Sequence, residues 1–456
     1  MHPLFEVLGK ALATDLKQMT EEGHDENVLL QELERAKSAR SLDALATLQQ
    51  EWWNRPSPPS FPYDEPNDWE AISASFPDPE PHARFRGTQS DLADRLHAAW
   101  LGRCAGCQLG KPIEGVHWPE RLQKLLQFVG SWPLTDYVNA PAPGVNPADS
   151  PAPEWVERLA KSPHARGRFD AVSPDDDIHY ALIGLRVLEK HGLEFTAEQV
   201  VAQVIHYTPG AVIFAAGRNM WRTGALGLTP PHTALFGNPC RQSLGAMIRC
   251  DPWGWAAPGN PALAARLAYK DAVASQIRNG IYSGIFFAAL LADTLATGDP
   301  ARSIDTAAAY VPPRSRFAEM VRFVKRQCAA EGDWQQVNAA IYARYPAECK
   351  QFNHSLPNAA IVLLGLLKGG GDFTRTLGIT VSAAMDTDCT GATVGSIMGC
   401  ALGTAGIPPH WTGPFHDTIH TDLAQCRELR ISDVARRTFE LAKGNVRYTA
   451  RRPQAQ

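Results

Sequence analysis

The sequence has no block of lysines and arginines that could follow a phosphate backbone. Lysine and arginine number 44 against 48 aspartates and glutamates, which gives a formal net charge of -4. A chain with this balance lacks the electrostatic footprint of a polyanion binder, so we expect no nucleic-acid partner. Its 456 residues can bury a large core, and this length is compatible with one large domain or with several ordinary ones.

Signals for secretion and membrane insertion are also missing. The start, MHPLFEVLGKALATDLKQ, has neither an uninterrupted apolar stretch nor a small-residue cleavage site, so we expect a cytoplasmic protein. One apolar run, LGITVSAAMDTDCTGATVGSIMGCALGTAGI, is long enough to cross a bilayer. Because Asp386 and Asp388 lie in its middle, we predict no membrane span and no membrane partner.

Cysteines are too few and too scattered for a disulfide-rich secreted scaffold, since only nine occur in the whole chain. We therefore expect reduced thiols. Cys104 and Cys107 form a CxxC pair, but no second pair or nearby histidine completes a four-ligand zinc site. The interpretation that we favour for this pair is the small-residue surface of a helix.

Alternation of apolar and polar residues, the pattern typical of strands, is almost absent. Residues 1–52 have helical spacing with many charges, and residues 54–82 are rich in proline. From about residue 90, alanine- and leucine-rich segments follow a period near 3.6 residues. We predict an all-α fold, with a helical N-terminal arm and connector over residues 1–85 and a compact multi-helix domain with long functional loops over residues 86–456.

Asp175, Asp176 and Asp177 form a first acidic cluster directly before a helical pattern. One explanation is capping, because an aspartate in the first turn accepts backbone N–H bonds and complements the helix dipole by about 0.3–1 kcal/mol. Three consecutive carboxylates also repel one another, and this repulsion outweighs the benefit of the last cap unless a cation neutralises them. Capping and metal binding are both open for this cluster.

Asp386 and Asp388 form a second cluster. Residues two apart cannot share one regular helix face, but both side chains can point at one ion from the turn before a helix. Hard oxygen ligands of this kind suit magnesium, manganese or calcium. Glycines then recur at every fourth residue: Gly391, Gly395, Gly399 and Gly403. A tight helix crossing without metal explains the glycines equally well, but it leaves the two aspartates unexplained, so we favour a metal site.

Both clusters resemble those of the ADP-ribosylglycohydrolase family, in which an early Thr-Asp-Asp-Thr motif and a late Asp-x-Asp-Thr motif bind two magnesium ions. The late match is DTDCTGATVGSIMG, and AAWLGRCAGCQLGKPIEG is similar to the family's opening helix and the acidic residue after it. The resemblance runs from about Leu96 to Gly406. It implies a magnesium-dependent hydrolase that cleaves a glycosidic bond to ADP-ribose.

The resemblance implies two Mg²⁺ ions, with Mn²⁺ as an alternative. The implied metal ligands are Asp175, Asp176, Asp177, Asp386 and Asp388. Asp175 stands where a threonine is usual. Cys389 stands where a threonine hydroxyl usually completes the coordination, and a thiol is a poor ligand for magnesium. A water, Thr387 or Thr390 is the alternative ligand there.

The resemblance also implies catalytic and substrate-binding residues. Glu114 in GKPIEG falls where the family tends to place a glutamate near the metals and the ribose, and the alternative for it is a surface loop. With Asp177 and Asp388 it forms the expected catalytic set. The expected substrate contacts are Gly245, Met247, Arg249, Asn279, Tyr282 and His354. Core packing of Met247 and helix capping by His354 are the alternatives for those two residues.

The implied partner is ADP-ribose or an ADP-ribosylated substrate. In the implied mechanism, metals bridged by Asp388 or a neighbouring carboxylate bind the ribose and activate water, while Glu114 moves a proton. Three alternatives stay open: a hydrolase of the same fold for another ribosyl or nucleoside-like N-glycosidic bond, a non-catalytic ADP-ribose-binding protein, and a metal phosphohydrolase.

Overall fold

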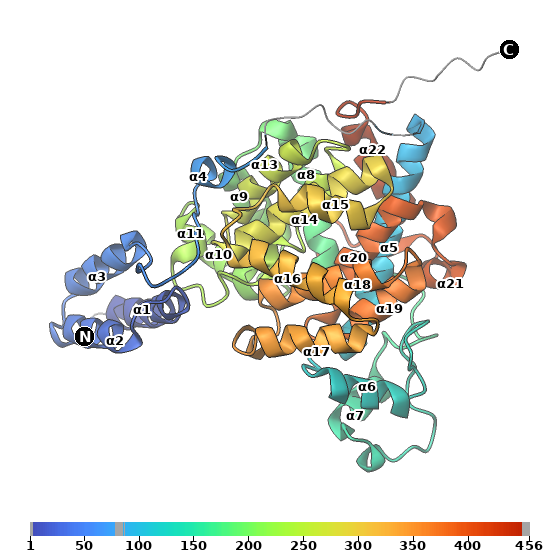
Figure 1. Ribbon diagram of the computed structural model, residues 1–456, viewed down its shortest axis with the longest axis horizontal. Coiled ribbons are helices and arrows are strands. Elements are labelled where there is room, and N and C mark those ends of the chain that lie inside the picture. The colour runs from blue at the N-terminus through green and yellow to red at the C-terminus, as the bar shows by residue number, and fades with distance from the viewer. Residues whose placement is uncertain (1–2, 78–84, 86, 449–456) are drawn as a thin grey trace.

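The computed structural model describes residues 3–77, 85 and 87–448, and the molecule is helical throughout, as predicted (Figure 1). In these described residues the strands are β1 (Thr418–His420) and β2 (Glu428–Arg430), which pair antiparallel as a small hairpin. Part of the predicted connector, residues 78–84, and residue 86 lie outside the described residues.

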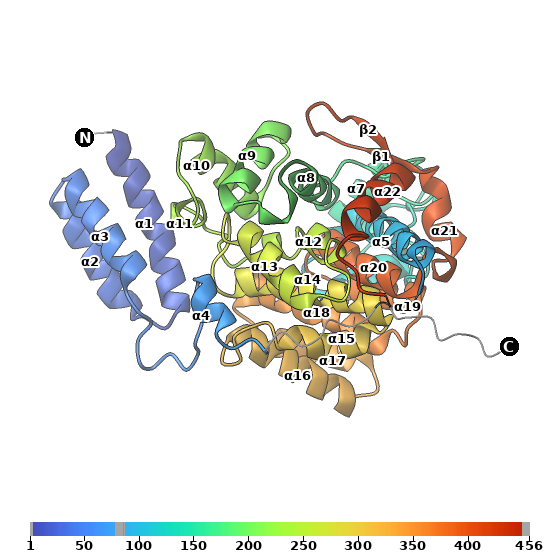
Figure 2. The ribbon, with the colours of Figure 1, turned by 90° about the horizontal axis from the view of Figure 1, so that it is seen from above.

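Helices α1 (Pro3–Glu21), α2 (Glu26–Ser38) and α3 (Leu42–Asn54) form a separate group at one side of the molecule (Figures 1 and 2). Their apolar faces meet in a small core of their own, which includes Leu12, Leu29, Leu33, Leu45 and Trp52. An extended connector follows and carries the short helix α4 (Trp69–Ser73). We refer to residues 3–77 as the N-terminal segment.

The rest of the chain forms the main body around one large apolar core. In chain order, its described α-helices are α5 (Gln89–Gly110), α6 (Pro119–Phe128), α7 (Pro153–Lys161), α8 (Asp176–His191), α9 (Ala197–Tyr207), α10 (Ala215–Ala225), α11 (His232–Leu235), α12 (Asp251–Trp255), α13 (Pro261–Ala272), α14 (Asn279–Thr297), α15 (Pro300–Ala308), α16 (Arg316–Ala330), α17 (Trp334–Arg344), α18 (Ser355–Lys368), α19 (Phe373–Ser382), α20 (Thr387–Leu402), α21 (Pro409–Thr412) and α22 (Ile431–Ala442).

Helix α14 is long and apolar enough to cross a membrane by length and composition alone. However, 94% of its most apolar window is buried inside the molecule. A helix that is apolar on all sides is also what the centre of a large helical core requires, and Figure 2 shows α14 surrounded by neighbouring helices. The predicted apolar run around residue 386 instead forms parts of α19 and α20.

Helices α5 and α20 cross at the centre with their backbones in contact. A Cβ atom built on Gly106 would lie 1.9 Å from the carbonyl oxygen of Gly391, and one built on Gly395 would lie 2.0 Å from that of Gly102. Side chains at these positions would clash with backbone, so the glycine stripe does mark a close helix crossing. The crossing also brings the end of α5 against the start of α20, where Thr387 Oγ1 donates to the Gly110 carbonyl at 2.9 Å.

Candidate metal centre and substrate cavity

Asp175 is the N-cap of α8, and its side chain accepts a hydrogen bond from the Asp177 backbone N–H at 3.0 Å. Capping, one of the two explanations for the first acidic cluster, therefore applies to this residue. Lys111, just after α5, forms an ion pair with the same carboxylate. Burial opposes ionisation of Asp175, but the Lys111 charge and these hydrogen bonds outweigh it and hold the pKa of Asp175 below its usual value.

Asp177 is completely buried and pairs with Arg103 of α5 at 3.1 Å. Arg103 also pairs with Asp251 at 2.8 Å, so one guanidinium forms ion pairs with two buried carboxylates. The second oxygen of Asp177, Oδ2, has no hydrogen-bond donor among the described residues. Burial raises the pKa of Asp177 well above its usual value despite Arg103.

Asp386 is the N-cap of α20, and Asp388 lies in the first turn of that helix. The chain enters α20 through Ala384 and Met385, both of which have a left-handed backbone with φ of 68° and 66°. Such a conformation costs energy for a residue with a side chain and is held only by its surroundings. It places both carboxylates at the mouth of the helix, where one oxygen of each, Oδ1, has no donor within the described part of the chain.

The two acidic clusters, remote in sequence, meet in space. Three sets of side chains have ligand atoms within 4.8 Å of one another: Glu114–Asp386–Asp388, Asp177–Asp388–Cys389 and Cys107–Asp175–Asp177. Asp388 belongs to two of these sets, as a ligand shared by two ions would. Buried carboxylate oxygens without a partner are costly unless a cation compensates them. The set Glu114–Asp386–Asp388 offers only oxygen ligands and fits a hard divalent cation, whereas each of the other two sets includes a thiol, which is a poor ligand for such an ion.

We call Glu114, Asp175, Asp176, Asp177, Asp386 and Asp388 the carboxylate cluster. Mutual repulsion and burial shift their protonation. The charge of Asp388, together with burial, raises the pKa of Glu114 to about 9. Burial and the charge of Asp175 raise the pKa of Asp176 to about 8 and that of Asp388 to about 6. Shifts of this sign mean that the cluster binds protons unless another positive charge replaces them.

A cavity of about 360 Å³ opens on the carboxylate cluster, a size typical of small-molecule sites. Its polar lining includes Lys111, Glu114, Asp175, Asp176, His179, Ser243, Asn353, Asp386, Asp388 and Asp422. Apolar and aromatic surface is contributed by Tyr180, Val212, Phe214, Leu244, Ile248 and Phe352. The cavity thus combines a strongly acidic floor with rings that can pack against an aromatic or sugar group.

Among the predicted substrate contacts, Gly245 lines this cavity. Met247 does not: it is fully buried in the main core, which is the alternative proposed for it. Arg249 is also turned into the core, where it pairs with Asp271 at 2.9 Å and donates to Ser275 Oγ at 2.7 Å. Packing and an internal ion pair engage the side chains of Met247 and Arg249, and neither side chain is part of the cavity lining.

The other three predicted substrate contacts also have partners inside the protein. Asn279 and Tyr282 of α14 bind the connector, through Glu65 at 3.0 Å and the Pro66 carbonyl at 2.5 Å. His354 is the N-cap of α18 and accepts from the Leu356 N–H at 3.2 Å. None of these three side chains lines the cavity as described, and capping, the alternative for His354, is its observed role.

Cys389 lines the cavity and belongs to a set of possible ligands with Asp177 and Asp388. Burial, with the charge of Asp177, raises the pKa of its thiol well above the usual value, so it stays protonated and is no nucleophile. The hydroxyls offered as substitutes are turned to backbone carbonyls, that of Thr387 to Gly110 and that of Thr390 to Asp386.

Sequence reasoning missed several lining residues. Among them, Lys111 has the clearest sequence signal, because it lies in the same GKPIEG segment as Glu114. His179 lies one turn after Asp176; burial lowers its pKa to about 4, and its neutral Nε2 accepts from the Asp422 N–H at 3.1 Å. Phe352 and Asp422 come from loops whose sequence carries no signal of this role.

Three comparisons with known proteins bear on this site. The profile of the ADP-ribosylglycohydrolase family matches residues 88–445. A solved structure described as an ADP-ribosylglycohydrolase-related protein complex is similar at 18% sequence identity and a TM-score of 0.48, and the match covers 78% of this chain and 100% of that one. No curated protein sequence matches the chain. Because the family match extends over most of the sequence, the chain belongs to the ADP-ribosylglycohydrolase family.

Proposed function

We propose that this protein is a magnesium-dependent hydrolase that cleaves a glycosidic bond to ADP-ribose. Family membership supports a glycohydrolase for ADP-ribose-type substrates. The observation that carries the finer proposal is the convergence of Glu114, Asp386 and Asp388 at one cavity, with Asp177 buried behind Asp388 and not part of the cavity lining, and with buried carboxylate oxygens that lack donors among the described residues.

Two Mg²⁺ ions are proposed, with Mn²⁺ as a chemically similar substitute. Glu114, Asp386 and Asp388 would hold one ion, and Asp177 and Asp388 would hold the other, with Asp175 and Asp176 beside them. Bound metal ions of this kind orient a sugar and lower the pKa of water. Lys111 keeps Asp175 ionised and Arg103 fixes Asp177, so both residues hold ligands in place without joining the chemistry.

Glu114 is the residue that we assign to proton transfer. It is half-buried at the cavity, and without metal its pKa is raised to about 9; a cation bound beside it would take the place of that proton, so the ionised carboxylate could accept a proton from water. It would accept a proton from the attacking water and pass it to the leaving group. Glycosidic cleavage passes through oxocarbenium-like charge on the sugar, and ionised Asp175 and its neighbours stabilise that charge. The rings of Phe214 and Phe352 offer apolar surface to a nucleobase.

The test is mass spectrometry of the products from arginine-, serine- and nucleotide-linked ADP-ribose, with Mg²⁺ and with a chelator. Release of ADP-ribose that requires Mg²⁺ is the expected result. Asp386→Ala should remove it, whereas Glu198→Gln, which changes an exposed carboxylate on α9, should not. Equal activity of Asp386→Ala and the unmodified protein would contradict the proposal, and phosphate release without ADP-ribose would indicate a phosphohydrolase.

A second candidate function is supported by Cys389, which places a thiol on the cavity where a hydroxyl is usual in the family. This change of pocket chemistry suits a hydrolase for another ribosyl or nucleoside-like N-glycosidic bond. Simple nucleosides are therefore included in the panel. Cleavage of nucleosides with no cleavage of ADP-ribosyl conjugates would favour this candidate, and tight ADP-ribose binding without any product would indicate a binding protein.

A further inference from the structure

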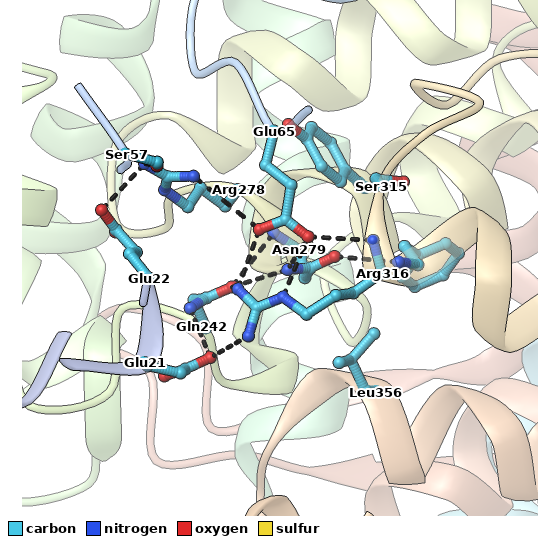
Figure 3. A network of polar contacts seen from close by, with 12 residues as sticks. Glu21, Glu22, Ser57, Glu65, Gln242, Arg278, Asn279, Ser315, Arg316 and Leu356 are labelled. Atoms are coloured by element: carbon cyan, nitrogen blue, oxygen red, sulfur yellow. Dashed lines mark hydrogen bonds and ion pairs between the residues drawn. The ribbon is translucent and has the colours of Figure 1, made fainter. Parts of the chain in front are cut away.

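The N-terminal segment lies outside the family match, yet it places carboxylates against the main body. Glu21 is the last residue of α1, and Glu22 follows it directly. Acidic residues at this end oppose the helix dipole, and the last turn of α1 has no basic residue to offset them. Their position costs α1 stability on its own, and contacts with the main body offset that cost. Figure 3 shows the network of polar contacts to which Glu21 and Glu22 belong.

Glu65 of the connector is the centre of that network. Its buried carboxylate forms a two-pronged pair with Arg316, with Nε at 3.0 Å and Nη2 at 2.8 Å. It also accepts from the Arg316 backbone N–H at 2.9 Å and from Asn279 Nδ2 at 3.0 Å. Since every one of these donors is in the main body, Glu65 fastens the connector to the starts of α14 and α16.

Glu21 extends the network toward the cavity. Its Oε1 accepts from Gln242 Nε2 at 2.6 Å and from Arg316 Nη1 at 2.8 Å (Figure 3). The same oxygen lies 3.5 Å from His354 Nε2. Gln242 in turn accepts from Asn279 Nδ2 at 2.8 Å. One carboxylate of the N-terminal segment therefore touches both Gln242 and His354, which belong to different parts of the main body.

Gln242 and His354 are each directly next to the cavity lining. Residues 243–245 follow Gln242, and residues 352–353 precede His354; all five line the cavity. We call these two stretches the wall segments. They are joined to each other, because the Leu244 N–H donates to the Asn353 carbonyl at 2.8 Å and the Ser355 N–H donates to the Gln242 carbonyl at 3.0 Å. Glu21 is thus bonded to the outer side of the paired wall segments.

We propose that Glu21 and Glu65 are positioning residues that hold the wall segments in the shape that binds substrate. Glu21 acts through Gln242 and His354, and Glu65 acts by fixing Arg316, which Glu21 also needs. Neither glutamate lines the cavity, so neither is a catalytic residue. The proposal rests on the proposed function insofar as the cavity binds substrate, but the bracing of the wall segments is a separate claim.

Glu21→Gln tests the proposal, because it keeps the size of the side chain and removes its charge. In the full-length protein, we expect KM for the ADP-ribosyl substrate to rise about tenfold, the effect of losing one charge-assisted hydrogen bond. We expect kcat to change less than about twofold, and Mg²⁺ affinity to stay the same, because the carboxylate cluster is not in contact with Glu21. Glu6→Gln, an exposed glutamate of the same helix, is the matched control.

Hydrogen exchange gives a readout that needs no substrate. Peptides covering residues 243–245 and 352–354 should exchange faster in Glu21→Gln than in Glu6→Gln, while peptides from α20 should not change. If Glu21→Gln does not fold, Gln242→Ala serves as the second variant and should reproduce the KM effect. Unchanged exchange and unchanged KM in Glu21→Gln would overturn the proposal. A wild-type protein without hydrolysis would instead contradict the proposed function, and the hydrogen-exchange result would still test whether Glu21 holds the wall segments in place.

Discussion

The molecule buries two groups of carboxylates that differ in how their charge is balanced. At the N-terminal segment, Glu21 and Glu65 face Arg316, and Glu22 faces Arg278. In the carboxylate cluster, Lys111 pairs with Asp175 and Arg103 with Asp177, while the other four carboxylates have no ion pair with Lys or Arg within the described residues. Glu21, Glu22 and Glu65 each face an arginine, whereas the carboxylate cluster has room for added positive charge.

The pKa shifts of these carboxylates follow the difference in charge balance. Burial opposes ionisation of Glu21, but His354 and Arg316 outweigh it and lower its pKa to about 2. Glu22 has less compensation, and burial raises its pKa. In the carboxylate cluster, repulsion from Asp388 and burial raise the pKa of Glu114 to about 9. A buried acidic group therefore indicates a metal site only where its neighbours leave it short of positive charge.

The largest expected effect comes from Asp388, which is shared by two sets of possible ligands. Asp388→Asn should lower kcat/KM by about 10²–10³-fold or more, because it weakens both proposed metal positions at once. Calorimetry should show the loss of Mg²⁺ binding at the same time. Glu21→Gln should keep its Mg²⁺ binding. Equal loss of Mg²⁺ binding in Asp388→Asn and Glu21→Gln would contradict the proposed difference between the two groups of carboxylates.

The pH dependence of stability should separate the groups next. Folding raises the pKa of Asp388, Asp176 and Glu114, so without metal the folded protein binds more protons than the unfolded chain, and its stability falls as pH rises. The loss should occur through about pH 6, 8 and 9. Saturating Mg²⁺ should raise the Tm by about 3 °C or more, and more at pH 8.5 than at pH 6. Thermal melts with Mg²⁺ and with a chelator measure this.

Substitutions within each group should change stability in opposite directions. Asp176→Asn should raise the Tm in chelator, because it removes a carboxylate whose charge is unfavourable there, and it should reduce the response to Mg²⁺. Glu21→Gln should cost about 1–2 kcal/mol at pH 7 with or without metal. Since the pKa of Glu21 is lowered, its contribution is present above about pH 4.5 and is lost as pH falls toward 2. A lower Tm for both variants in chelator would contradict the comparison.

The sequence was most informative where a local pattern has a single physical solution. Two aspartates at the mouth of a glycine-striped helix favour a turn before the helix and a close helix crossing, and the structure has both. It was least informative for Arg249, Asn279 and Tyr282. A polar residue in an apolar segment looks the same in sequence whether it meets a ligand or an internal partner, and here the partners are internal.

Long-range contacts between separate elements explain the remaining gaps. Nothing near Glu21 in the sequence predicts that it meets Gln242 and His354, because the two partners come from distant loops. The same holds for Phe352 and Asp422 at the cavity. By contrast, helix periodicity is a local property, which is why the all-α fold could be predicted while most of the cavity lining could not.

The smallest expected effect is at Cys389, which lines the cavity beside the carboxylate cluster. Cys389→Thr replaces a protonated thiol by a hard hydroxyl oxygen, so Mg²⁺ affinity should rise by roughly two- to fivefold, while affinity for the softer Zn²⁺ should fall. Calorimetric titration with each ion measures both changes, and Cys328→Thr, a half-buried cysteine on α16 outside the cavity, is the control. Because the two ions should respond in opposite directions, a change of the same sign for both would mean that residue 389 alters the fold of the site and not its ligand set.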